Sequence, residues 1–220
     1  MIIYHGSDHI IERPLYHYGN RRNDYGFGFY CTENKELAKE WASSSEYNGF
    51  VNKYDLDESE LRILDLNEYG LLTWLTILLE NRSFSKNTPL AREAYEYLIS
   101  NFKIEYESFD IIKGYRADDS YFSFARDFIN GTISYEQLSA AMRLGDLGNQ
   151  IVLKSEKAFS KIEYIGAENV DSRIWYQKRQ ERDNAARNAY LNSFKGYARG
   201  DIYITHILDE EMKNDNVRLQ

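Results

Sequence analysis

Two stretches near the start of the chain decide the fold: Tyr4-His5-Gly6-Ser7 and, further on, Asp24-Tyr25-Gly26-Phe27-Gly28-Phe29-Tyr30-Cys31-Thr32. The β-branched and aromatic residues at positions 1–4 predict a strand. That strand ends at a histidine and at a glycine whose backbone a small molecule can approach closely. The second stretch predicts a glycine-rich turn that runs into a strand over 27–31, and a helix is expected to start near Glu33.

In this order and at this separation, the two stretches resemble the NAD-binding core of ADP-ribosyltransferases of the histidine–tyrosine–glutamate type. The resemblance implies that the imidazole of His5, in its His-Gly-Ser setting, hydrogen-bonds a hydroxyl of the adenosine ribose. It also implies that the backbone N–H and C=O of Gly6 clamp the carboxamide of nicotinamide, and Ser7 completes the motif. NAD is therefore the expected co-substrate.

Aromatic residues of the second stretch and of the following helix extend this resemblance. Tyr30 stands where the family's tyrosine closes a Gly-x-Gly-aromatic-Tyr strand, after Gly28, and Trp41 stands where the family often has a second aromatic residue. Two aromatic faces suit the planar nicotinamide ring, because stacking holds the ring and positions its glycosidic bond. The alternative is that Tyr30 and Trp41 are ordinary core residues in a chain that has 19 tyrosines.

The third signature residue of the family, a glutamate at the start of a late strand, is replaced in this chain. The best match is Gly148-Asn149-Gln150-Ile151-Val152-Leu153, which places Gln150 at the catalytic position. A shift of one residue would place Asn149 there and would reverse which side chain faces the cleft. Glutamine can hold the 2′-hydroxyl of the nicotinamide ribose, but it stabilises the oxocarbenium-like transition state poorly and cannot act as a general base.

Two further segments contribute candidate residues. The acidic loop Ala117-Asp118-Asp119-Ser120 precedes an expected helix over 122–129. One of its aspartates could replace the missing carboxylate or contact a ribose or the acceptor; alternatively, these residues only cap the helix. Arg82, at the end of an expected helix over 71–81, either pairs with a phosphate of the dinucleotide or is solvated at the helix C-terminus.

The combined pattern is similar to a group of bacterial toxins of toxin–antitoxin pairs within the ADP-ribosyltransferase clan, over residues 2–165. This resemblance implies mono-ADP-ribosylation of a macromolecular acceptor, protein or nucleic acid, and a cognate antitoxin that covers the cleft. The implied fold is α+β, with two split antiparallel sheets that form an NAD cleft and a helical insertion over about 70–105. Residues 1–166 would form this domain, and residues 167–220 a helical C-terminal extension.

The C-terminal region contains the one substantial basic cluster of the sequence. A strand is expected over 161–165, a helix over 172–194, and a short strand or turn over 201–205, followed by a final helix that contains Leu208 and Met212. The basic cluster on the expected helix faces an RNA, an acidic partner or simply water. It consists of Arg173, Lys178, Arg179, Arg182 and Arg187.

Composition restricts the class of protein and the kinds of site. The formal net charge of −8 argues against bulk electrostatic binding to nucleic acid or to an anionic membrane. The single cysteine, Cys31, excludes an intrachain disulfide and a cysteine-based zinc site, and the histidines lack a metal-like spacing. A soluble cytoplasmic protein without membrane contact or metal is expected, since neither a leader nor an apolar run of bilayer length is apparent.

Two other functions remain open at the level of sequence. The first is a non-catalytic module that binds NAD or a partner and has kept the fold without the glutamate. The second is a phosphotransferase-like enzyme that acts on a 2′-phosphorylated RNA. That reaction needs arginines around the phosphate, and the expected cleft segments offer Arg13, Arg21, Arg22 and Arg116.

Overall fold

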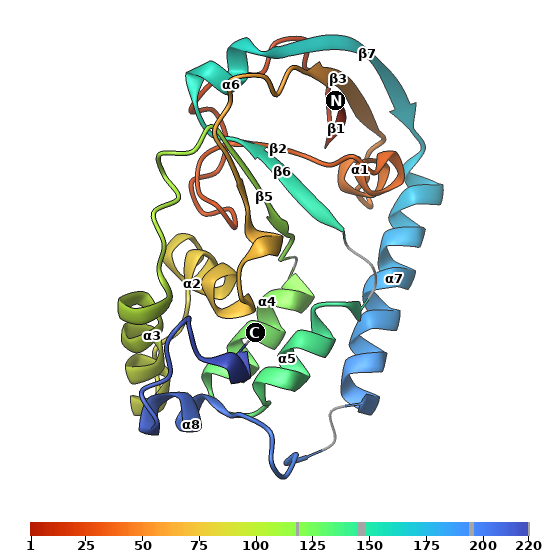
Figure 1. Ribbon diagram of the computed structural model, residues 1–220. Coiled ribbons are helices and arrows are strands. Elements are labelled where there is room, and N and C mark those ends of the chain that lie inside the picture. The colour runs from red at the N-terminus through yellow and green to blue at the C-terminus, as the bar shows by residue number, and fades with distance from the viewer. Residues whose placement is uncertain (118, 145–147, 194–195, 220) are drawn as a thin grey trace.

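The computed structural model describes all residues except 118, 145–147, 194–195 and 220 (Figure 1). It is an α+β structure with two β-sheets and a layer of helices. The strands are β1 (Ile2–Ser7), β2 (Phe29–Cys31), β3 (Gly49–Leu56), β4 (Ile63–Asp65), β5 (Ile111–Tyr115), β6 (Asn149–Leu153) and β7 (Ile162–Val170). The helices are α1 (Lys35–Ala42), α2 (Leu71–Asn81), α3 (Pro89–Phe102), α4 (Asp119–Ile129), α5 (Tyr135–Ala141), α6 (Glu156–Ser160), α7 (Ser172–Ser193) and α8 (Ile204–Asp209), with short 3-10 helices η1 (Leu66–Glu68) and η3 (Val217–Leu219).

The first sheet contains three antiparallel strands in the order β1-β3-β7. Its strand β1 is also bridged to the second sheet. The backbone N–H groups of Tyr4 and Thr32 each donate to the other's carbonyl oxygen, over 2.8 and 2.9 Å. This bridge holds together the two stretches that the sequence singled out, although a long loop separates them along the chain.

The second sheet contains four strands in the order β2-β6-β5-β4. β2–β6 and β5–β6 are antiparallel pairs, whereas β4 pairs with β5 in parallel. The prediction of two antiparallel sheets is therefore wrong for this edge, and the second sheet is mixed. A parallel pair needs a long crossover connection, and α2 and α3 lie between β4 and β5 in the chain and form it.

The second sheet is buried on both faces. Successive side chains of a strand point to opposite faces, and the strand residues divide accordingly between two hydrophobic cores. Ile111 and Ile151 pack toward the first sheet, in the core that also buries Cys31. Ile112 and Val152 pack into the larger core that the helices form. The molecule therefore has three layers, with the mixed sheet in the middle.

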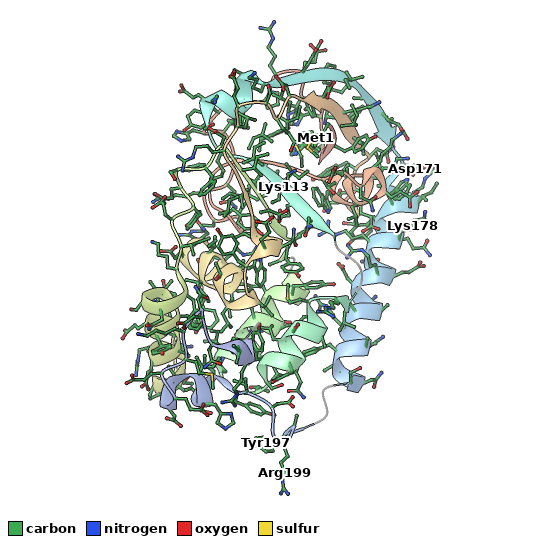
Figure 2. The ribbon with its side chains drawn as sticks, in the orientation of Figure 1. Met1, Lys113, Asp171, Lys178, Tyr197 and Arg199 are labelled. Atoms are coloured by element: carbon green, nitrogen blue, oxygen red, sulfur yellow. The ribbon has the colours of Figure 1, made fainter. Side chains whose placement is uncertain are left out.

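Helices cover the outer face of the second sheet (Figure 1). α2 is buried over residues 71–79, because apolar side chains lie on all sides of this helix and pack into the large core with α3, α4, α5 and α8. Figure 2 shows the resulting elongated shape, with Met1 at the sheet end and Tyr197 and Arg199 at the tip of the helical end. The helices α2 and α3 lie within the range predicted for a helical insertion.

Two expectations for the C-terminal region need correction. The last strand continues to Val170, beyond the expected end at residue 165, because it pairs with β3 along the full length of that strand. The final helix, α8, begins at Ile204, inside the range 201–205 that was expected to be a strand or turn, and it ends at Asp209. Ile204 and Ile207 are both fully buried at a spacing of one helical turn, and the N–H of Tyr203 donates to Nδ1 of His206 over 3.1 Å. The long helix α7 occupies 172–193, close to its predicted range.

The first prediction concerns the contact between β1 and α1. A methyl group at Gly6 would overlap with the carbonyl oxygen of Ala38 and would lie 2.7 Å from the backbone nitrogen of Ala42. We expect Gly6→Ala to lower the free energy of unfolding by about 2–3 kcal/mol, because a backbone neighbour cannot easily move. At Gly166 there is nothing within 4 Å of the added methyl group, so Gly166→Ala should change stability by less than about 0.5 kcal/mol. Urea unfolding of both variants measures this; equal losses would contradict the packing described.

Candidate functional site

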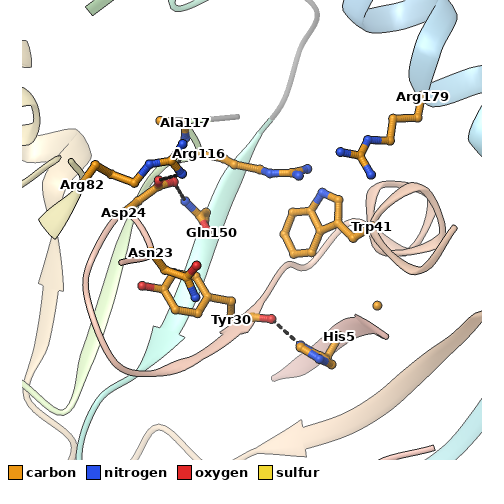
Figure 3. A pocket seen from close by; sticks show the side chains of 11 residues that line it. His5, Asn23, Asp24, Tyr30, Trp41, Arg82, Arg116, Ala117, Gln150 and Arg179 are labelled. Carbon is orange, nitrogen blue, oxygen red and sulfur yellow. Dashed lines mark hydrogen bonds and ion pairs between the residues drawn. The ribbon is translucent and has the colours of Figure 1, made fainter. Parts of the chain in front are cut away.

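A cavity of about 300 Å³ lies where the two stretches meet the start of β6 and the side of α7 (Figure 3). Six residues that the sequence selected as candidates line it, and the others come from the turn before β2, the loop after β5, and α7. The lining residues are His5, Gly6, Asn23, Asp24, Tyr30, Trp41, Arg82, Arg116, Ala117, Gln150 and Arg179.

His5 is held in one tautomer at the end of the cavity. Its Nδ1 lies 2.7 Å from the carbonyl oxygen of Tyr30, and a carbonyl only accepts, so Nδ1 carries the proton and donates. The ring stacks on Phe29 with the two centroids 4.4 Å apart. Burial lowers the pKa of His5 to about 4, more than its hydrogen bond raises it. The imidazole is therefore neutral near pH 7, and Nε2 is an acceptor for a hydroxyl group.

Tyr30 is fixed by backbone contacts to the turn that precedes its strand. Its hydroxyl donates to the carbonyl of Gly26 over 2.7 Å and accepts from the N–H of Tyr25 over 3.0 Å. Burial raises the pKa of Tyr30 above its usual range, so the phenol is neutral. Gly26 has a φ of 73°, in the region that favours glycine. The hydroxyl of Tyr30 thus ties down the turn, and its ring is the part that lines the cavity.

Trp41 lies on α1, next to Arg116 from the loop after β5. The guanidinium carbon of Arg116 is 4.5 Å from the centroid of the Trp41 ring, which is a cation–π contact. The indole Nε1 of Trp41 is buried and forms no hydrogen bond within the described part of the chain. A ligand oxygen placed in the cavity could satisfy this donor.

The remaining residues of the first two motifs have different positions. Gly6 lines the cavity, and the absence of a side chain there also allows α1 to pack on β1. Ser7 and Gly28 are outside the cavity lining. The hydroxyl of Ser7 donates to the carbonyl of His9 over 2.6 Å, which stabilises the turn after β1. A methyl group at Gly28 would lie 3.0 Å from the carbonyl oxygen of Leu153, so this glycine allows β2 to approach β6.

Gln150, and not Asn149, faces the cavity. Gln150 lies on the same face of β6 as Val152 and is only 4% exposed, whereas Asn149 is exposed. The amide nitrogen of Gln150 donates to Oδ2 of Asp24 over 2.7 Å and to the carbonyl of Tyr115 over 3.3 Å. The position of this residue at the floor of the cavity follows from the alternation of β6 between the two cores.

Asp24 is a site residue that the sequence analysis missed. Its carboxylate is 5% exposed and accepts hydrogen bonds at both oxygens. Oδ2 accepts from the N–H of Ala117 over 2.8 Å as well as from Gln150, and Oδ1 accepts from Nη1 of Arg82 over 3.1 Å. Burial raises the pKa of Asp24, and these three donors oppose the rise. In the sequence, the position of Asp24 just before the Gly-x-Gly turn could have indicated this role.

Three arginines give the cavity a positive wall. Arg82 was expected to be either a phosphate ligand or solvated; its side chain lies in the cavity, bound to Asp24, with its Cζ 4.9 Å from the centroid of Phe122. Arg116 lies beside Trp41. Arg179 extends from α7 toward the cavity (Figure 3) and belongs to the basic cluster that the sequence did not assign to the site. Arg13, Arg21 and Arg22 do not line the cavity.

The rest of the basic cluster is directed to other partners. Arg173 pairs with Asp171 over 2.7 Å, and Arg182 pairs with Glu40 of α1 over 2.8 Å. The second pair attaches α7 to the helix that carries Trp41. Arg179 is therefore held in place by a helix that is itself fixed to the site.

Other site expectations concern aspartates, metals and membranes. Asp118 and the side chain of Asp119 lie outside the described part of the structure. The backbone of Asp119 is described as the first residue of α4.

Among the described residues, no three His, Cys, Asp or Glu side chains come together as metal ligands. No helix in the described ranges is both long and apolar enough to cross a bilayer.

The fold and the site together define the class of protein. It is an α+β protein with a cavity between the edge of a sheet and a long C-terminal helix, and arginines line this cavity. The chain belongs to the family described as "Protein of unknown function (DUF3990)", whose sequence profile matches residues 1–164. No curated protein and no solved structure matches the chain. The matched range ends before α7, so every lining residue except Arg179 lies inside it.

A second prediction follows from the burial of neutral His5. Between pH 6.5 and 4 the imidazole takes up a proton in the unfolded chain but not in the folded one, so its contribution to stability falls as the pH falls. The full effect is on the order of 3 kcal/mol, from about 1.4 kcal/mol per unit of pKa. Urea midpoints of the wild type and His5→Gln should therefore converge or cross between pH 7 and 4.5. Parallel pH dependences in the two proteins would contradict the neutral, buried imidazole.

Proposed function

We propose that this protein is an NAD-dependent mono-ADP-ribosyltransferase, which transfers ADP-ribose from NAD to a macromolecular acceptor. One observation carries the proposal: residues from all three signature segments line a single cavity. His5 comes from the first segment, Tyr30 from the second and Gln150 from the third. The resemblance to ADP-ribosyltransferases selects these residues from sequence alone, and their convergence supports it.

The proposed reaction exchanges one bond at the nicotinamide ribose. The C–N bond between C1′ and nicotinamide breaks, and a bond forms between C1′ and a nucleophilic atom of the acceptor. Nicotinamide leaves as a neutral molecule, and the proton of the acceptor passes to water, because the amide of Gln150 cannot take it. Gln150 would accept a hydrogen bond from the ribose 2′-hydroxyl, and Nε2 of His5 would accept one from the adenosine ribose.

The contact between Arg116 and Trp41 influences where nicotinamide would bind. Arg116 already covers one face of Trp41. Tyr30, by contrast, is fixed through its hydroxyl and needs no rearrangement to present its ring. Nicotinamide would therefore stack on Tyr30, and its entry next to Trp41 would move Arg116 toward the diphosphate. Arginine suits this role, because its planar fork binds phosphate oxygens in pairs.

The size of the cavity indicates that it holds only part of NAD. Its volume of about 300 Å³ is at the lower end of the range for small-molecule sites, about 300–1,000 Å³. A second hollow of about 470 Å³ lies between residues 43–45 and α7, and it shares Arg179 with the cavity. The reactive half of NAD would occupy the cavity, and the hollow offers room for the rest of the dinucleotide or for the acceptor.

The wider role follows from the resemblance. The protein would be the cytoplasmic toxin of a bacterial toxin–antitoxin pair, and the antitoxin would neutralise it by covering the cavity. The acceptor would be a protein or a nucleic acid. The net charge of −8 favours recognition through a local surface over attraction by the whole protein.

The three arginines favour a second candidate, a phosphotransferase-like reaction on 2′-phosphorylated RNA. The sequence named Arg116 in an expected cleft segment and Arg82 as a candidate phosphate ligand, and both line the cavity together with Arg179. Arg82 is already bound to Asp24, however, which leaves its charge partly compensated. Consumption of a 2′-phosphorylated oligonucleotide with NAD, compared with the unphosphorylated oligonucleotide, separates this reaction from ADP-ribosyl transfer.

The replacement of the family's glutamate favours a third candidate, a module that binds NAD or a partner without catalysis. Gln150 provides hydrogen-bonding atoms but no negative charge at the position where charge stabilises the transition state. This candidate predicts NAD binding without release of nicotinamide.

A third prediction tests the proposed reaction directly. Purified protein incubated with labelled NAD and a bacterial lysate should release nicotinamide and label either the protein or the nucleic-acid fraction. Tyr30→Ala and Gln150→Ala should each reduce the label by about a hundredfold or more. NAD binding without label or nicotinamide release would instead identify the non-catalytic module. Failure to bind NAD would exclude the proposed function.

A fourth prediction tests the role of α7. Arg179→Ala should weaken NAD binding about tenfold, because the cavity loses a cation that can face the diphosphate. Arg173→Ala is the matched control: it removes the same charge from the same helix, at a residue paired with Asp171 outside the cavity. Titration calorimetry with NAD measures both affinities. Equal affinities in the two variants would place the diphosphate away from α7.

A further inference from the structure

We infer that Asp24 is the positioning residue of this site: its carboxylate holds the amide nitrogen of Gln150 and so directs Oε1 into the cavity as the acceptor for a ribose hydroxyl. The inference deepens the proposed function and rests on it, because it assigns that acceptor role to one atom. It also explains why a glutamine occupies the position where related enzymes have glutamate.

The orientation of the Gln150 amide is determined by its neighbours. One neighbour is a carboxylate oxygen of Asp24, at 2.7 Å, and the other is the carbonyl oxygen of Tyr115, at 3.3 Å. Both are acceptors, so the NH₂ group must lie between them. Figure 3 shows the amide nitrogen directed at Asp24 and the oxygen directed away from it. Oε1 forms no hydrogen bond within the described residues and is the polar atom that remains for a ligand.

Asp24 is itself held rigidly, because donors on three segments bind its two oxygens. The N–H of Ala117 fixes Oδ2 from the loop after β5, and Arg82 fixes Oδ1 from the end of α2. Such a carboxylate cannot turn to release Gln150 without leaving a buried donor unsatisfied. Burial still raises the pKa of Asp24, so these contacts do not fully offset the loss of solvation. A charge that is costly to bury is typical of a functional residue.

The same geometry accounts for the missing glutamate. A glutamate at position 150 would bring a second carboxylate against Asp24, close to the 2.7 Å that now separates the amide nitrogen from Oδ2. Two carboxylates at such a distance cannot both ionise. The site therefore has one carboxylate, and it belongs to the turn before β2 and not to β6. Because Arg82 compensates the negative charge of Asp24, this carboxylate acts by orienting Gln150 and not by its charge.

A charge swap tests this inference. Asp24→Asn replaces one of the two acceptor oxygens with an NH₂ donor, so the donors of Arg82, Ala117 and Gln150 can no longer all be satisfied. Gln150→Glu places two carboxylates together. We expect each variant to lower the rate of nicotinamide release about a hundredfold. In the double variant an amide and a carboxylate face one another again, with their positions exchanged. The N–H of Ala117 then loses the oxygen that it shares with Gln150, so we expect a partial rescue, to about tenfold above either single variant, which a purely structural role would not produce.

Asp110→Asn is the matched control for the loss of a buried carboxylate. Asp110 is 9% exposed and accepts from the N–H of Arg62 and from the hydroxyl of Ser155, outside the cavity. This variant should lower the melting temperature and leave the rate of nicotinamide release unchanged. A Gln150→Glu variant as active as the wild type would overturn the inference. A double variant no faster than either single variant, at an unchanged melting temperature, would also overturn it.

A measurement without NAD distinguishes failure of this inference from failure of the proposed function. The side-chain amide protons of Gln150, assigned by their absence from the spectrum of Gln150→Glu, should exchange with water about a hundredfold more slowly than those of the exposed glutamines. Exchange as fast as in the exposed glutamines would refute the contact with Asp24, whether or not NAD binds. Slow exchange in a protein that does not bind NAD would uphold the orientation and refute the proposed function.

Discussion

The buried carboxylate of Asp24 is the interaction on which the site depends. It joins the turn before β2 to the end of α2, the loop after β5 and the start of β6, through Arg82, Ala117 and Gln150. No two of these partners are close in sequence. Because each contact is a hydrogen bond to a charged group in a buried setting, each is stronger than a bond between neutral groups at the surface. The cavity is therefore formed by polar contacts, whereas the layers around it are held by apolar packing.

The second constraint on the structure is the close approach of backbone segments at two glycines. Gly6 allows α1 to lie against β1, and Gly28 allows β2 to lie against β6. These contacts set the distance between the first sheet, the second sheet and the helix that carries Trp41. The residues of the two glycine motifs thus have structural reasons for their identity in addition to the ligand contacts that the resemblance implies. Arg182 and Glu40 then attach α7 to α1, which brings Arg179 to the open side of the cavity.

Much of the architecture could be predicted from local patterns. The β-branched and aromatic residues located the first two strands, and the helices expected over 71–81 and 172–194 match α2 and α7 within a few residues. The parallel pairing of β4 with β5 could not be predicted, because strand direction depends on the crossover through α2 and α3. A strand or turn was expected over 201–205 before a final helix, but this helix already begins at Ile204, because Ile204 and Ile207 are buried together in the large core. Tertiary packing decided where the helix starts.

The sequence by itself determined which residue types meet at the site: His5, Tyr30 and Gln150 were selected from their motifs, and each lines the cavity. Only the tertiary structure decided that Gln150 rather than Asn149 faces inward, because this depends on which core buries each face of β6. It also decided that Asp24, Arg82 and Arg179 belong with them. A charged residue has no pattern along the chain that reveals its partner, since its partners lie on distant segments that only the folded layers bring together.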